Sequence, residues 1–220
     1  MTLYRKHAQG PAVKSDFTLS HDNIDTYHRM SQQMDDEVRW IKTLINLRHK
    51  LDHPEENTDS LYTKEYLERR LAKIESMHPM NDEAREHIRV SQELFLLEKE
   101  LNIMRPLVFD KVEGQKPEHH ERMNILNDKW NDLEEQRNSI YGRKYQDLKD
   151  NLPKIYYMIL EGVDMDTVNS CFNKMKSVLS GNLSTEEAAS RLMNESETKY
   201  NLPKTLYDPI RMNRRTGGKK

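Results

Sequence analysis

The chain has 220 residues, of which 35 % are hydrophobic and 33 % are charged, and its formal net charge is -2. Globular domains are usually about 45–50 % apolar and about 25 % charged, so this chain is short of core-forming residues. The balance of charge excludes strong self-repulsion, and the single cysteine, Cys171, excludes an intramolecular disulfide and a cysteine-based zinc site.

The first part of the chain predicts an extended arm at 1–19 and then two helices. Apolar residues recur at spacings of three and four from about 20 to 51, which indicates a long amphipathic helix. A shorter stripe of Leu67, Leu71 and Ile74 predicts a second helix at about 63–77. The segments around Pro54 and Pro79 end these two helices, because proline cannot continue the helical hydrogen bonds.

Two further long helices are predicted before residue 152. The third begins after Asn81, a good N-cap residue, and we expect Pro106 to end it. Residues 105–117 then form a linker. The fourth helix runs from about 118 to 152, and Gly142 marks a soft point within it. The stripes of these helices are Val90, Leu94, Leu97, Leu101 and Met104 in the third, and Met123, Leu126, Trp130, Leu133 and Ile140 in the fourth.

The sequence predicts a small module of three short helices at 153–203. Gly162 and Gly181 are placed as helix stops, and Ser184 with Glu187 has the spacing of a capping box. The tetrapeptide NLPK occurs at 151–154 and again at 201–204, and we interpret both copies as helix exits. Residues 204–220 follow as a basic tail.

These elements together predict an all-α fold. The narrow stripes with charged flanks in 20–152 are typical of coiled-coil-like packing. Because the linkers are long enough for the chain to reverse, we expect an elongated antiparallel helical bundle of hairpins rather than one parallel rod.

The residues that we single out for partner binding are one tryptophan and the cations of the tail. Trp40 lies beside the first stripe, so it fits a core position or an exposed anchor for another protein. The tail cations could hold an acidic protein surface or nucleic acid through charge, and they are Arg211, Arg214, Arg215, Lys219 and Lys220.

Motifs that carry catalytic chemistry are missing from the sequence. Neither a Gly-rich phosphate loop nor a G-x-S-x-G or H-E-x-x-H motif occurs, and we expect no enzyme activity, no cofactor and no small-molecule substrate. His49 and His53 have a spacing that could hold a metal ion, but His53 precedes Pro54 at a helix end, so we expect no metal site. We interpret Cys171 as a buried structural thiol.

The sequence also predicts where the protein is found. A single cysteine favours a reducing, intracellular compartment. The longest apolar run is shorter than a membrane span, and residues 1–17 lack the apolar stretch of a secretory signal.

Residues 160–203 contain a helix ending in "SG", a capped "LSTEEAA" helix and an exit through "KYNLP". In these features the segment resembles C-terminal helical segments of virion and minor capsid proteins of large nucleocytoplasmic DNA viruses. The resemblance implies a cement or scaffold protein of a capsid shell, located in the virion, and it implies no catalytic residues.

The sequence therefore favours a non-enzymatic structural component of a large assembly: a cement, spacer or scaffold that contacts other protein subunits. Two alternatives stay open. One is a cytoplasmic coiled-coil adaptor that binds its partners through the seam containing Leu126 and Leu133. The other is a nucleic-acid binder that uses the tail from Arg211 to Lys220, with the steep salt dependence that phosphate contacts produce.

Overall fold

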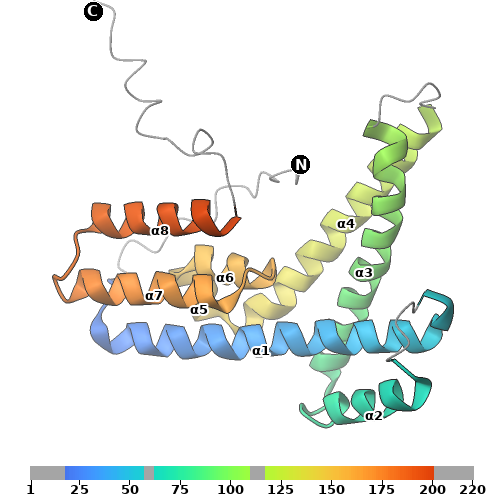
Figure 1. Ribbon diagram of the computed structural model, residues 1–220, viewed down its shortest axis with the longest axis horizontal. Coiled ribbons are helices and arrows are strands. Elements are labelled where there is room, and N and C mark those ends of the chain that lie inside the picture. The colour runs from blue at the N-terminus through green and yellow to red at the C-terminus, as the bar shows by residue number, and fades with distance from the viewer. Residues whose placement is uncertain (1–17, 57–61, 110–116, 201–220) are drawn as a thin grey trace, which may run out of the picture. The chain divides into compact units, whose positions relative to one another are not determined.

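The computed structural model describes residues 18–56, 62–109 and 117–200. These residues form an all-α structure, in which no strand occurs within the described ranges. The helices are α1 (His21–Asp52), a 3₁₀ turn η1 (Pro54–Glu56), α2 (Lys64–Glu75), α3 (Asp82–Phe109), α4 (Pro117–Lys144), α5 (Gln146–Asn151), α6 (Pro153–Leu160), α7 (Met165–Leu179) and α8 (Thr185–Tyr200) (Figure 1). The predicted all-α class is confirmed. None of the described helices has both the length and the apolar character of a bilayer span.

The described chain forms two compact units. The first unit comprises residues 30–162, and the second comprises residues 18–29 together with 163–200. Helix α1 contributes residues 21–29 to the second unit and residues 30–52 to the first. The boundary at 162/163 places α6 with the first unit, whereas the sequence grouped all of 153–203 together. The contacts of α6 explain the difference, because the Tyr156 hydroxyl hydrogen-bonds to the backbone carbonyl and the side-chain Oδ1 of Asn138 in α4.

The first unit is built around a long hairpin of α3 and α4, which run antiparallel side by side (Figure 1). Both predicted stripes meet in the core of this hairpin. Its buried side chains are Val90, Leu94, Leu97, Leu101, Met104, Val108, Met123, Leu126, Leu133 and Ile140. The seam that contains Leu126 and Leu133 is therefore filled within the chain, and it is not open to a partner as the adaptor hypothesis required.

Helix α3 continues past Pro106 to Phe109, so the expectation that this proline ends the helix is wrong. A proline inside a helix removes a hydrogen bond and costs about 3 kcal/mol. Packing opposes that cost here, because Met104 and Val108 on either side of Pro106 are buried in the hairpin core.

The predicted helix from 118 to 152 is interrupted at Tyr145, which has φ -116° and ψ 37°. The interruption lies three residues after Gly142, the soft point noted in the sequence. Tyr145 is buried and its hydroxyl donates a hydrogen bond to Glu37 of α1. We attribute the break to this tertiary contact, which the local sequence does not contain.

The first NLPK copy acts as a helix exit, as predicted. Asn151 ends α5, and Pro153 begins α6 at a position where the missing N–H costs nothing. Gly162 (φ +77°) and Gly181 (φ +70°) adopt the left-handed backbone that ends helices. The second NLPK copy lies outside the described residues.

The second unit has a small core. Ile24 and Tyr27 of α1, Val168 and Phe172 of α7, and Ala188 of α8 are its buried hydrophobic residues among those described. Polar contacts supplement this core. His28 stacks on Phe172 and its Nε2 lies 2.7 Å from Oδ1 of Asn169, while Lys176 forms an ion pair with Asp25. Helices α7 and α8 are antiparallel neighbours (Figure 1).

Candidate interaction surface

The α3–α4 hairpin exposes apolar side chains as well as burying them. Leu96, Ile103 and Leu107 of α3 are 46 %, 68 % and 45 % exposed, and Ile125 of α4 is 61 % exposed. Single exposed apolar residues are common on protein surfaces and need no explanation. A set of large apolar side chains on one face is the feature that indicates an interaction site.

Helical geometry places these four side chains on one face of the hairpin. Each of them immediately precedes a buried core residue, so each is rotated by about 100° in the same sense from the core direction. Because the two helices run antiparallel, the same rotation brings the side chains of α3 and of α4 to the same side. We call this surface the hairpin face.

An ion pair crosses the hairpin face and supports this placement. Glu100 precedes the core residue Leu101, and Arg122 precedes the core residue Met123, so both belong to the same flank. The guanidinium of Arg122 contacts the carboxylate of Glu100. The pair lies along the stripe of Leu96, Ile103 and Leu107, and its charges divide the apolar surface.

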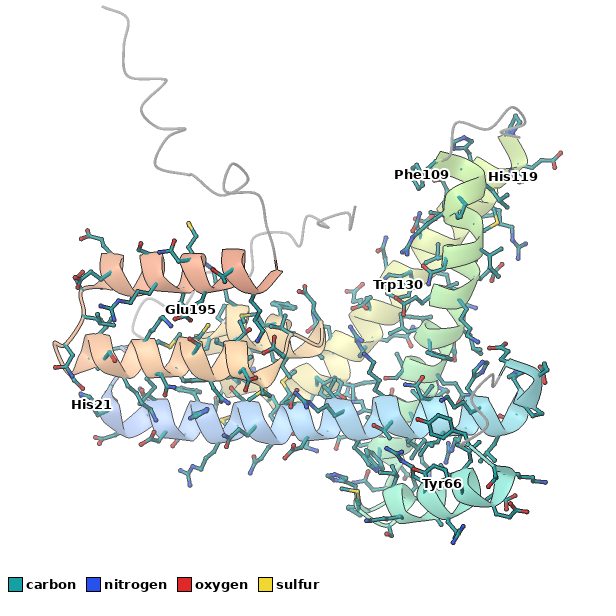
Figure 2. All side chains as sticks on the ribbon, viewed as in Figure 1. His21, Tyr66, Phe109, His119, Trp130 and Glu195 are labelled. Atoms are coloured by element: carbon teal, nitrogen blue, oxygen red, sulfur yellow. The ribbon has the colours of Figure 1, made fainter. Side chains whose placement is uncertain are left out.

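The two helices differ in charge along the hairpin face. On α3 the stripe carries Glu93 and Glu100, and on α4 it carries Arg122 and Lys129, which precedes the partly buried Trp130. From Glu93 to Glu100 the α3 side is therefore acidic, and from Arg122 to Lys129 the α4 side is basic. One turn further along, the signs are exchanged, because Arg89 precedes the core residue Val90 on α3 and Asp132 precedes the core residue Leu133 on α4. Figure 2 shows the extent of the hairpin, with Phe109 and His119 at one end and Trp130 farther along α4.

The stripe borders an open groove of about 460 Å³ in the same unit. Leu96 and Glu93 line the groove together with Arg48, Ile88 and Arg89. Arg89 forms an ion pair with Glu93 at 2.7 Å, and Arg48 forms one with Glu75 at 2.8 Å. The apolar stripe thus reaches, at Leu96, a groove that is lined by charged side chains.

The first unit contains a cluster of polar side chains around the buried Glu37. The carboxylate of Glu37 accepts hydrogen bonds from His87 Nδ1 (3.1 Å), Lys144 Nζ (2.7 Å) and the Tyr145 hydroxyl (2.9 Å). The His87 ring is fully buried and stacks on Tyr141 with centroids 4.2 Å apart. The cluster joins three segments, and nothing in the sequence analysis pointed to it.

The electrostatics of Glu37 follow from these partners. Burial disfavours the charged form and by itself raises the pKa, but the hydrogen bonds from His87, Lys144 and Tyr145 outweigh it and lower the pKa of Glu37 to about 2. Burial and the nearby charge of Glu37 raise the pKa of the Tyr145 hydroxyl. Glu37 is thus a fixed anion that holds its donors, an arrangement suited to fastening helices together.

The second unit has its own polar cluster between α7 and α8. Lys174 donates to Ser170 Oγ at 2.6 Å and to both carboxylate oxygens of Glu195 at 2.6 and 2.7 Å, and Figure 2 labels Glu195 on α8. A serine beside a lysine can act as a nucleophile and its base only when the amine is neutral. Lys174 is paired with a carboxylate instead, and the hydrogen bonds that Glu195 accepts from Lys174 and from Ser170 lower the pKa of Glu195. The cluster therefore attaches α8 to α7.

The two histidines singled out in the sequence each lie beside a carboxylate. His49 Nε2 lies 3.0 Å from Glu56, and His53 Nδ1 lies 3.1 Å from Glu55. The residues that the structure describes include no group of three or more His, Cys, Asp or Glu side chains placed to hold a metal ion. Cys171 is half-buried, and burial raises the pKa of its thiol.

The predicted partner-binding residues are placed differently from the hairpin face. Trp40 is only 5 % exposed and its Nε1 donates to the carbonyl of Ile74 at 2.7 Å, so it is a core residue and not an exposed anchor. The tail cations Arg211, Arg214, Arg215, Lys219 and Lys220 lie outside the described residues, and their role stays a prediction.

Comparisons of the chain with models of protein families, with curated proteins and with solved structures found no match.

Proposed function

We propose that this protein is a non-enzymatic structural component of a protein assembly, in which the hairpin face is its docking surface. The observation that carries the proposal is the row of Leu96, Ile103, Leu107 and Ile125 on one side of the hairpin. Burying such a row against a neighbour removes apolar surface from water, at about 25 cal/mol per Å².

The polar clusters support a structural role for the rest of the chain. Glu37 and Glu195 each accept several hydrogen bonds from side chains on other helices, and these contacts fasten helices to one another. A rigid hairpin loses little conformational freedom when it docks, which favours binding.

The assembly that we propose is the protein shell of a large DNA virus. This part of the proposal rests on the resemblance of residues 160–203 to segments of virion proteins. The helix ends that carry the resemblance, at Gly181 and at the Ser184–Glu187 capping box, are formed in the chain. The neighbours of the protein in its native complex test this class of assembly.

The test is to purify the protein in its native complex and to identify its neighbours by mass spectrometry. The variant Ile103→Asp/Ile125→Asp places two charges on the hairpin face, and we expect it to lose at least one neighbour. The matched control is Met77→Asp, which changes another apolar residue of the first unit that is 60 % exposed but lies outside the hairpin face. An unchanged set of neighbours for the double variant would contradict the proposal.

A further inference from the structure

We infer that the hairpin face binds a second copy of this chain, so that two hairpins form an antiparallel four-helix bundle around a two-fold axis parallel to the hairpin. The inference rests on the proposed function, because it names the neighbour that occupies the same surface. It is carried by the charges on the hairpin face and by the register of α3 against α4.

The intrachain ion pair fixes that register. Glu100 contacts Arg122, so these residues lie at the same height along the hairpin. Because α3 and α4 are antiparallel, moving one turn back along α3 and one turn forward along α4 reaches a second common height, at Leu96 and Ile125. One more turn in the same direction reaches Glu93 and Lys129. Residues three or four apart lie on the same side of a helix, so all these side chains stay on the hairpin face.

The three levels are complementary in character. They pair an acidic residue with a basic one, then two apolar residues, then again an acidic residue with a basic one. In these three levels the acidic members belong to α3 and the basic members belong to α4. At the next level the signs are exchanged, because Arg89 of α3 comes to the height of Asp132 of α4. Two surfaces of this kind can pair without bringing like charges together, provided that α3 of one copy lies over α4 of the other.

A two-fold axis parallel to the hairpin produces this arrangement. Rotating one hairpin by half a turn and placing it face to face with the first puts α3 over α4 of the second copy, and α4 over its α3. The heights along the hairpin are unchanged, so Leu96 of one copy meets Ile125 of the other, and Glu100 meets Arg122. Each helix then has antiparallel neighbours, as in four-helix bundles.

The α3 stripe has the spacing that such a bundle requires. Leu96, Glu100, Ile103 and Leu107 are separated by four, three and four residues, which is the alternation of a coiled-coil seam. The hairpin thus has one seam that is filled by its own two helices and a second seam that is exposed. An isologous dimer covers the second seam on both copies at once.

A second copy fits this surface better than an unrelated helix does. An unrelated partner would have to supply, at each height, a charge opposite in sign to the one on α3 and to the one on α4. The chain itself meets this requirement, since its own α4 carries a charge of opposite sign at the height of each charged residue of the α3 stripe.

The first experiment measures the mass of the full-length chain by sedimentation over a series of concentrations. We expect a monomer–dimer equilibrium for the natural sequence and for Met77→Asp. For Ile103→Asp/Ile125→Asp we expect a monomer, with circular dichroism unchanged to show that the hairpin has folded. A natural chain that stays monomeric throughout the series would overturn the inference.

The second experiment uses charge reversal to test the register. Glu100→Arg and Arg122→Glu each place like charges at the same height in a homodimer, and each should weaken self-association by about tenfold. When the two variants are mixed, their opposite charges face each other between chains. We expect heterodimers to form in preference to either homodimer, as measured by native mass spectrometry.

The mixture of the two variants distinguishes a contact between chains from a role of the Glu100–Arg122 pair within one chain. Each variant keeps its own like-charged pair in the mixture, so a purely intrachain role of the ion pair cannot restore association. Heterodimers that form no more readily than homodimers would overturn the inferred register.

The proposed function can survive the failure of this inference. If the natural chain is monomeric but Ile103→Asp/Ile125→Asp removes a different protein from the native complex, the self-pairing is wrong and the docking surface stands. If that double variant changes neither self-association nor the native complex, both proposals fail.

Discussion

Nδ1 of His87 lies 3.1 Å from Oε1 of Glu37, although the two residues are 50 positions apart and their side chains are 0 % and 10 % exposed. Lys144 and Tyr145 donate to the other carboxylate oxygen. One anion therefore holds α1, α3 and the end of α4 together.

Replacing Glu37 should destabilise the first unit strongly. Glu37→Gln removes the charge and turns one acceptor oxygen into a donor that faces existing donors, so we expect the free energy of unfolding to fall by about 3 kcal/mol. Chemical denaturation followed by circular dichroism measures the change. Asp36→Asn is the control, because Asp36 is its exposed neighbour in α1 and should change stability by less than about 0.5 kcal/mol. Equal losses of unfolding free energy for the two substitutions would show that the hydrogen bonds to Glu37 do not stabilise the first unit.

The same carboxylate should make stability depend on pH in the acid range. The pKa of Glu37 is lowered from 4.5 to about 2 on folding, so the unfolded chain binds the proton more readily. The stabilisation is present above pH 4.5 and is lost as the pH falls towards 2, and it amounts to about 3 kcal/mol. The difference in unfolding free energy between the natural chain and Glu37→Gln should therefore narrow over that interval. A difference that is constant from pH 6 to pH 2 would contradict the shift of this group.

A substitution of Trp40 tests whether this residue belongs to the core or is an anchor for another protein. Trp40→Phe keeps most of the buried ring but removes the donor to the Ile74 carbonyl, and we expect a loss of about 1 to 2 kcal/mol in stability. Self-association should be unchanged under conditions where the variant is folded, because Trp40 does not belong to the hairpin face. Denaturation and sedimentation measure the two quantities. Normal stability with lost association would restore the anchor interpretation.

Local signals in the sequence were enough to predict most helix ends. Asn81 accepts from the backbone N–H of Ala84, and Ser184 and Glu187 form the reciprocal capping box. Such contacts span only three residues, so the residue types alone specify them. The hairpin core was predictable for a similar reason, since the stripes of α3 and α4 repeat with helical spacing.

The tertiary relationships were not predictable from one sequence. Glu37 meets Lys144 and Tyr145 across more than 100 residues, and no local pattern encodes that contact. The break at Tyr145 depends on the same contact. The hairpin face, by contrast, left a signal that was missed: Leu96, Ile103 and Leu107 form a second row with heptad spacing beside the first stripe.

Two glycines should respond to alanine in opposite directions. Gly162 has φ +77° and open space around it, so Gly162→Ala introduces backbone strain and should cost about 1 kcal/mol. Gly142 lies within α4, where alanine favours the helix by about 1 kcal/mol. The nearest atom to an added Cβ is the flexible end of Lys149, at 2.9 Å, and its displacement offsets part of the gain. We expect Gly142→Ala to raise stability by about 0.5 kcal/mol, and denaturation midpoints measure both changes. Loss of stability in both variants would mean that the Lys149 side chain cannot move.

The two sides of α4 should separate stability from association. Leu133 is 4 % exposed and belongs to the hairpin core, whereas Ile125 is 61 % exposed and belongs to the hairpin face. Leu133→Ala leaves a cavity and should lower the free energy of unfolding by about 3 kcal/mol. Ile125→Ala removes no buried contact in the single chain and should change it by less than about 0.5 kcal/mol.

For self-association, we expect Ile125→Ala to have the larger effect and Leu133→Ala the smaller, which is the reverse of their effects on stability. Ile125→Ala removes apolar contact from the inferred interface and should weaken the dimer by about tenfold, while folded Leu133→Ala should dimerise as the natural chain does. Sedimentation at a temperature where both variants are folded provides the measurement. A loss of association in proportion to the loss of stability would show that the dimer depends only on how much chain is folded. The reversed order would show that one helix uses its two sides for separate purposes, the inner side for folding and the outer side for binding.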